Sequence, residues 1–206
     1  KNCKKIINLR FLIFFISVIF VGLLISKTHD DFPFYHLQQS LNLSRNKIQI
    51  GLSNLDFTNA HHSSIFYLNS LFFLPKFNYY YFNAPSHIFF TGATLALIEL
   101  SKNEKKIVFL KFFSFISVFY FLLKFTRSAE YGTDIVGQIL VVLFVYFSML
   151  FLLSSNNNRK NNYLIISGLL IVYCCTVKTY FTLYLILYFY LIFNLKVNNI
   201  LNFIKF

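Results

Sequence analysis

Four carboxylate side chains stand out because they occur in two short polar segments of an otherwise apolar chain. Asp30 and Asp31 lie in KTHDDFPFYHLQQS. Glu130 and Asp134 lie in RSAEYGTDIVGQ, where a spacing of four residues would place them on one face if the segment is helical. A carboxylate can deprotonate a substrate hydroxyl or hold a divalent cation, and a neighbouring carboxylate raises the pKa of one of the pair. Asp30 and Asp31 are therefore candidate general bases.

Two basic side chains are candidates for binding an anion near these carboxylates. Arg127 lies three residues before Glu130, and Lys178 stands alone between two apolar runs, where it must reach water or an anion such as a phosphate. Structural alternatives remain for each group. The aspartate pair can mark the point where an apolar helix meets water, and the carboxylate of Asp134 can interact favourably with the dipole of a helix that begins there. Glu130 can form a surface ion pair, and the side chain of Lys178 can extend to the membrane surface.

The composition predicts that membrane helices hold these side chains. Apolar residues make up 57% of the 206 residues and charged residues only 13%, against about 45–50% and 25% in soluble domains. The net charge of +12 comes from basic residues at the edges of apolar runs, which argues against nucleic acid as a partner. Three cysteines, two of them adjacent, indicate neither a disulfide framework nor a zinc site.

The apolar runs predict an all-α polytopic bundle of about six spans in one domain, residues 1–206. An N-terminal signal peptide is the alternative for the first run, but no A-x-A-like cleavage site follows it. Lys111 falls inside the third run, and several runs are short. The predicted spans are 6–26, 84–100, 107–123, 135–153, 163–177 and 180–195.

The basic residues predict a cytoplasmic amino terminus. The four segments then placed inside carry four, three, two and two Lys or Arg residues, whereas the two short outer connections carry three in all. The remaining segment, 27–83, becomes a long outer loop. Leu37 and Leu41 share a helical face, and the apolar segment 63–75 is too short to span, so both are expected to form interfacial helices.

The arrangement resembles the GT-C superfamily of membrane glycosyltransferases, which carry acidic residues directly after the first span and often a second acidic site after the third. A narrower likeness, to bacterial envelope-polysaccharide proteins, rests on D-x-x-x-Y-H at Asp31, Tyr35 and His36, on GLSN at 51–54, and on the serine pair 63–64. The likeness covers residues 6–180. Members usually have more spans, so the chain is expected to be a fragment or a shortened relative.

The resemblance implies transfer of a sugar from a polyprenyl-phosphate-linked donor to a lipid, glycan or protein acceptor at the outer face of a bacterial plasma membrane. Asp30 or Asp31 would be the base, and Glu130 and Asp134 would orient the acceptor or a metal. Arg127 and Lys178 would neutralise the donor phosphate. His36 would support the acidic residues. A divalent cation remains open as a cofactor, because some members use one and others do not.

Two other functions remain open from the residues alone. A transporter or metal-handling protein would use histidines and carboxylates of the outer loop, although their spacing matches no common metal motif. Those residues are His29, Asp30, Asp31, His36, His61 and His62. A non-catalytic component of polysaccharide assembly would make the carboxylates incidental. No phosphate-binding loop, dinucleotide fingerprint, nucleophile elbow or H-E-x-x-H occurs in the sequence.

Overall fold

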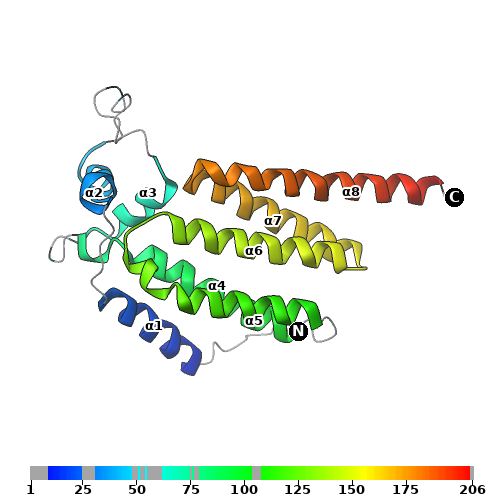
Figure 1. Ribbon diagram of the computed structural model, residues 1–206, viewed down its shortest axis with the longest axis horizontal. Coiled ribbons are helices and arrows are strands. Elements are labelled where there is room, and N and C mark those ends of the chain that lie inside the picture. The colour runs from blue at the N-terminus through cyan, green and yellow to red at the C-terminus, as the bar shows by residue number, and fades with distance from the viewer. Residues whose placement is uncertain are drawn as a thin grey trace.

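The computed structural model is all-helical over the residues that it describes, which are 9–24, 31–47, 51, 54, 62–74, 76, 79–103 and 108–204. Among the described residues, six helices of 16 to 21 residues form the body, and shorter helices lie at one end of it (Figure 1). The elements are α1 (Leu9–Leu24), η1 (Phe32–His36), α2 (Leu37–Arg45), α3 (Ser64–Leu71), η4 (Tyr79–Tyr81), α4 (Ala84–Asn103), α5 (Val108–Leu123), η5 (Phe125–Ala129), α6 (Asp134–Leu153), α7 (Asn157–Val177), η6 (Thr179–Tyr184) and α8 (Leu185–Ile204).

Successive helices from α4 to α8 run antiparallel along the long axis, so their connections alternate between the two ends (Figure 1). One end, here called the loop end, gathers η5, η6, α2 and α3 with the start of α6. Helix α6 is central because it packs against α4, α5, α7 and α8, and its closest partner is α7. The loop end therefore brings together segments that are far apart in the sequence.

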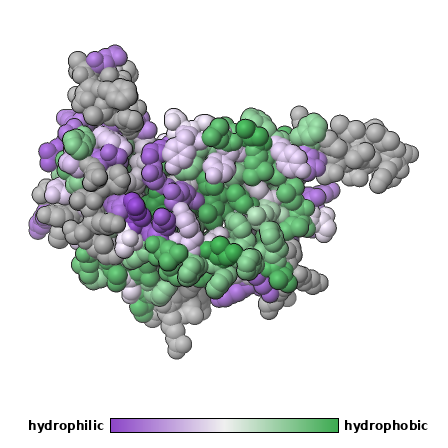
Figure 2. Space-filling view, viewed as in Figure 1, coloured by the Kyte–Doolittle hydropathy of each residue, from purple (hydrophilic) through white to green (hydrophobic). Residues whose placement is uncertain are grey.

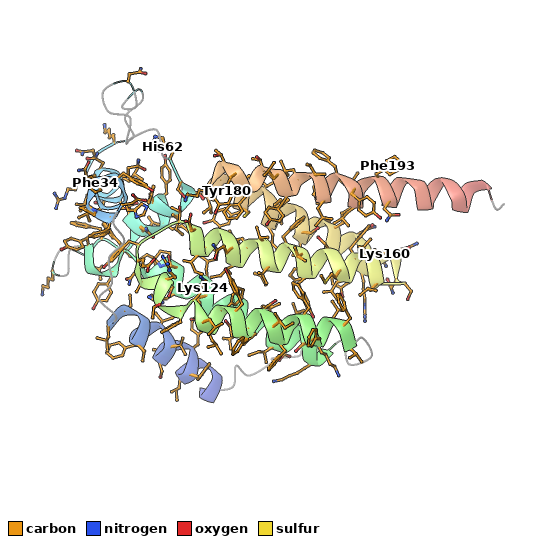
Figure 3. All side chains as sticks on the ribbon, in the orientation of Figure 1. Phe34, His62, Lys124, Lys160, Tyr180 and Phe193 are labelled. Atoms are coloured by element: carbon orange, nitrogen blue, oxygen red, sulfur yellow. The ribbon has the colours of Figure 1, made fainter. Side chains whose placement is uncertain are left out.

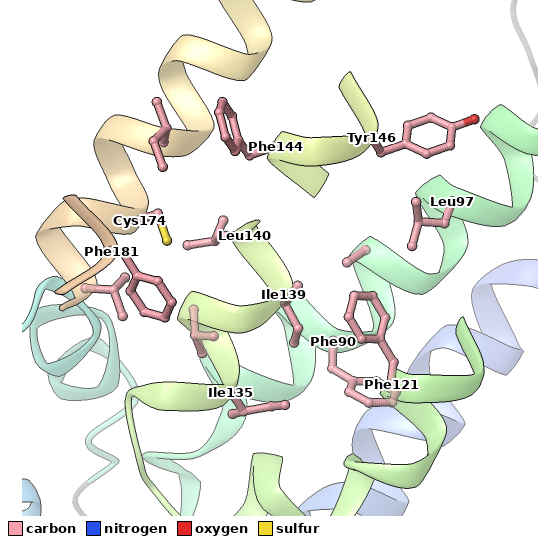
Figure 4. Packing of buried hydrophobic residues seen from close by; sticks show 14 of the residues in the cluster. Phe90, Leu97, Phe121, Ile135, Ile139, Leu140, Phe144, Tyr146, Cys174 and Phe181 are labelled. Atoms are coloured by element: carbon pink, nitrogen blue, oxygen red, sulfur yellow. The ribbon is translucent and has the colours of Figure 1, made fainter. Parts of the chain in front are cut away.

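The apolar core forms around the first turns of α6. Ile139, Leu140 and Phe144 are buried and meet aromatic rings from α4, α5 and η6, including Phe90 and Phe121 (Figure 4). Close-packed interiors tolerate few changes of volume, so these contacts fix the positions of the helices relative to one another. The core thus lies directly behind the start of α6 at the loop end.

A glycine lets η6 pack directly onto α6. Gly137 faces the ring of Phe181, and a Cβ atom at position 137 would overlap that ring. The same close approach allows the thiol of Cys174 to donate to the carbonyl oxygen of Gly137 at 3.4 Å. The link between α7 and α8 is therefore held against the beginning of α6.

The helices lie where the apolar runs predicted them, with differences at the ends. Helix α7 begins at Asn157, six residues before the predicted span, because Asn156 accepts hydrogen bonds from the backbone of residues 158 and 159. The last predicted span begins as the 3₁₀ segment η6.

Among the described residues, Asp134–Leu153 and Asn157–Val177 are long and apolar enough to cross a membrane. The described parts of the other four predicted spans are not both long enough and apolar enough to cross a membrane. Helix α5 has only 16 residues, and α4 carries Ser86, His87, Thr91 and Glu99 among its apolar residues.

Both helices expected in the long loop are present as α2 and α3. Ser63 begins α3, because its hydroxyl accepts from the N–H of Ile65 at 3.4 Å. Ile65 and Phe66 are buried against the rest of the protein, since α3 packs on α2, α4 and α7. Protein contacts therefore account for part of the apolar face that suggested an interfacial helix.

Candidate functional site

A cavity of about 250 Å³ at the loop end is lined by side chains from the beginning, middle and end of the described chain. We call it the charged cavity. Six Asp, Glu, Lys or Arg side chains line it: Asp31, Lys124, Arg127, Glu130, Asp134 and Lys178. Figure 2 shows hydrophilic residues gathered toward this end, with hydrophobic surface beside them along the helices. The charged side chains thus lie where the apolar surface of the helices ends.

Helix ends bring these side chains together. Asp31 directly precedes η1, Arg127 lies in η5, and Asp134 is the first residue of α6. Lys178 joins α7 to η6, and Lys124 follows α5 (Figure 3). Because each of these helices ends or begins at the loop end, each polar connection delivers its charges to the same place.

A buried polar contact holds η5 in position. His87 of α4 and Ser128 of η5 are fully buried, and His87 Nδ1 lies 2.9 Å from Ser128 Oγ. Gly22 of α1 packs so closely on the imidazole that a Cβ atom there would overlap it. His87 therefore joins α1 and α4 to the segment that carries Arg127.

Asp31 is held by a tyrosine one helical turn later. The hydroxyl of Tyr35 donates to Asp31 Oδ2 at 3.1 Å, as a spacing of four residues allows. Burial, together with the negative charge of Asp31, raises the pKa of Tyr35 to about 12. Tyr35 thus remains a hydrogen-bond donor at neutral pH and fixes one oxygen of the Asp31 carboxylate.

Glu130 is a buried carboxylate with an arginine partner. Arg127 Nη1 lies 2.9 Å from Glu130 Oε2, and the side chain of Glu130 is only 7% exposed, compared with 50% for Arg127. A buried carboxylate without a partner is strongly unfavourable, so Arg127 compensates the charge of Glu130. The surface ion pair expected for these two residues is in fact half inside the protein.

Asp134 and Lys178 form a second ion pair across 44 residues of sequence. Both side chains are partly exposed, and such pairs add roughly 0–1 kcal/mol to stability. Asp134 lies in the first turn of α6, where its negative charge interacts favourably with the helix dipole. The sequence suggested that Lys178 stands alone between two apolar runs, but its ammonium group contacts a carboxylate at the cavity.

Six of the seven residues selected from the sequence line the charged cavity. They are Asp31, His36, Arg127, Glu130, Asp134 and Lys178. Asp30, the seventh, lies outside the described residues. Sequence reasoning missed Lys124 and Gln138 as lining residues. Lys124 lies one helical turn before Arg127, a spacing that could have suggested it.

A metal site is not evident among the described residues, where no group of three or more His, Cys, Asp or Glu side chains could hold an ion. His36 is buried against the rings of Tyr35 and Phe66, and His62 lies outside the charged cavity. His29 and His61 of the expected metal ligands lie outside the described residues.

Comparison with known proteins places the chain in a family defined by sequence. The family model described as "Domain of unknown function (DUF8201)" matches residues 1–206. Searches of curated proteins and of solved structures found no match. Because the match spans the whole sequence, the chain belongs to the DUF8201 family.

Proposed function

We propose that this protein is a membrane glycosyltransferase that moves a sugar from a polyprenyl-phosphate-linked donor to an acceptor at the outer face of a bacterial plasma membrane. The observation that carries the proposal is the charged cavity, where three carboxylates and three cations meet at the end of apolar helices. Such a cavity can offer a base to an acceptor hydroxyl and cations to a phosphate leaving group.

Exposed apolar side chains support the membrane placement. Phe115 of α5, Leu169 of α7 and Phe189 of α8 are 71%, 68% and 64% exposed, and many neighbours on these helices and on α1 are similar. Soluble monomers rarely leave large contiguous apolar surfaces in water. We propose that α1 and α4 to α8 cross the membrane as six spans, with tilt and bilayer thinning accommodating the shorter helices.

The proposed chemistry assigns a task to each charged group. Asp31 takes the proton of the acceptor hydroxyl, and the resulting oxygen attacks the anomeric carbon of the donor. The bond from that carbon to the phosphate oxygen breaks, and the polyprenyl phosphate leaves with the bonding electrons. Lys178, Arg127 and Lys124 stabilise its charge. Glu130 and Asp134 hold two of these cations in place.

The phosphate is expected to bind beside Lys124 and Lys178. Among the described residues, no ion pair is formed by Lys124, so its charge is available to an anion. Lys178 can turn from Asp134 to a phosphate oxygen because both side chains are partly exposed. His36 packs edge-on against Tyr35 and thereby supports the tyrosine that holds Asp31.

Labelling of single cysteines tests the outward orientation. In a chain whose three cysteines are replaced by serine, Asn46→Cys after α2 is expected to react with a membrane-impermeant maleimide in intact spheroplasts. Ser155→Cys, between α6 and α7, is expected to react only after permeabilisation. Both positions are exposed, so access to the reagent decides the result. The reverse pattern, or equal labelling of both sites, would contradict the orientation.

Donor turnover tests the activity. The full chain in vesicles of phosphatidylethanolamine and phosphatidylglycerol would be given undecaprenyl phosphate carrying radiolabelled glucose, mannose or N-acetylgalactosamine. Release of sugar or its transfer is expected from at least one donor. Lys178→Met is expected to raise the donor KM at least about tenfold, because a phosphate-binding cation is lost and Asp134 is left unpaired.

Lys160→Met is the matched control. Lys160 lies at the opposite end of the bundle from Lys124 and outside the charged cavity, so the donor KM should not change (Figure 3). A folded wild-type chain that turns over none of the donors would refute the transferase. An unchanged donor KM in Lys178→Met would refute the phosphate-binding role of Lys178, whose ion pair with Asp134 would then serve only to hold the loop end together.

A further inference from the structure

A second cavity adjoins the charged cavity and shares three of its lining residues, Tyr35, Thr133 and Lys178. It has a volume of about 160 Å³ and is also lined by Phe66 and Tyr180. We call it the aromatic cavity. Both volumes lie below the roughly 300 Å³ at which pockets for drug-sized ligands begin, so each suits a single ring.

The aromatic cavity differs from its neighbour in chemistry. Lys178 is its only Lys, Arg, Asp or Glu lining residue among those described, and its other polar groups are His62 and the hydroxyls of Ser63, Thr133, Thr179 and two tyrosines. The Tyr180 ring is 48% exposed and lies 5.6 Å from Lys178 Nζ. An aromatic face surrounded by hydroxyl groups matches a sugar ring, which has apolar C–H faces and a polar edge.

Tyr35 forms the wall between the two cavities and connects them to the base. Its side chain lines both, and its hydroxyl donates to Asp31, which lines only the charged cavity. A ligand hydroxyl in the aromatic cavity would therefore reach Tyr35 before it reaches Asp31. A tyrosine that stays protonated at neutral pH can accept one proton while it gives up its own.

We propose that the aromatic cavity is the acceptor site, that it takes a glycan ring stacked on Tyr180, and that Tyr35 relays the acceptor proton to Asp31. This inference rests on the proposed transferase function. In the step, the acceptor O–H bond breaks and its proton goes to Tyr35 Oη, while the Tyr35 proton moves to Asp31 Oδ2. The acceptor oxygen forms the new bond to the anomeric carbon, and the phosphate leaves with the electron pair of the broken bond.

The partition of the donor sugar between a glycan acceptor and water tests the acceptor site. The full chain in nanodiscs would receive the donor that it turns over, with p-nitrophenyl glucoside, mannoside or galactoside as acceptor probe. Tyr180→Leu is expected to shift the product ratio from glycoside toward free sugar at least about tenfold, because the stacking surface for the ring is lost. Tyr35→Phe is expected to shift the ratio in the same direction, because water can enter the charged cavity and reach Asp31 without the relay.

Tyr184→Leu is the matched control, because Tyr184 lies in the same η6 segment, is 40% exposed and lines neither cavity. It should keep the wild-type product ratio. An unchanged ratio in Tyr180→Leu would overturn the acceptor site, and an unchanged ratio in Tyr35→Phe would overturn the relay.

Fluorescence tests binding without requiring turnover. The chain contains no tryptophan, so Tyr180→Trp introduces a single reporter into the aromatic cavity. Saturable quenching by at least one p-nitrophenyl glycoside, relieved by an excess of the corresponding methyl glycoside, would support a glycan site. Absence of such quenching in a variant that still turns over donor would overturn the acceptor site while leaving the transferase intact. Quenching without any donor turnover by the wild-type chain would instead refute the transferase and with it the relay, and would leave the aromatic cavity as a glycan-binding site.

Discussion

Asp31→Asn is expected to lower kcat for sugar transfer by about 100- to 10 000-fold, the usual contribution of a general base. The amide preserves the shape of the side chain and can still accept the hydrogen bond from Tyr35, but it cannot take up the proton of the acceptor. Donor KM should stay within about threefold, because the proposed phosphate site consists of the cations of the charged cavity. Initial rates with the radiolabelled donor would give both constants.

The control for Asp31→Asn is Glu99→Gln, the same loss of charge on an exposed carboxylate of α4 that does not line the charged cavity. It should retain wild-type rates. If Asp31→Asn kept more than about one tenth of the wild-type kcat, Asp31 would not be the base. A large increase in donor KM with an unchanged kcat would assign Asp31 to binding instead.

Gly137→Ala is expected to destabilise the protein by about 1–3 kcal/mol, because the added methyl group must displace a well-packed ring. The ring is that of Phe181, which is 3% exposed and has little room to move. Displacing it shifts η6 and therefore Lys178, which directly precedes that segment. Thermal unfolding in detergent should show a Tm lower by several degrees, and transfer activity should fall with it.

Gly92→Ala makes the same substitution in α4 without the steric conflict. A Cβ atom at position 92 would have no neighbour within 4 Å. Alanine is favoured over glycine in a helix by up to about 1 kcal/mol, so Tm should be unchanged or higher. Equal changes in Tm for the two variants would show that the contact between Gly137 and Phe181 does not limit the approach of η6 to α6.

The sequence predicted the positions of the helices well because apolar runs and their polar boundaries are local signals, but only two of the six predicted spans are long and apolar enough to cross a membrane among the described residues. It could not predict which boundaries meet. The pairing of Lys178 with Asp134 and the contact of His87 with Ser128 join residues more than 40 positions apart, and only the packing of α6 with α7 and α4 brings them together. Alternation of the helices between two ends was sufficient to expect that Asp31, Arg127 and Asp134 share a face.

Other features depended on packing that carries no local signal. The apolar segment that forms α3 was expected at a membrane surface, yet Ile65 and Phe66 are buried by α2, α4 and α7. The aromatic cavity was not foreseen, because its rings come from η1, α3 and η6 and a high aromatic content alone indicates no site. Tyr35 was identified only as part of a short motif, and its bond to Asp31 gives it a specific role.

The ion pair between Asp134 and Lys178 also has a consequence for biosynthesis. The carboxylate leaves the ribosome 44 residues before its partner, so Asp134 is synthesised before Lys178 can compensate its charge. Only when α7 has turned back does the lysine arrive and complete the charged cavity. A nascent chain therefore cannot assemble the complete site until the hairpin of α6 and α7 has formed, so the last cation of the cavity is also the last to be synthesised.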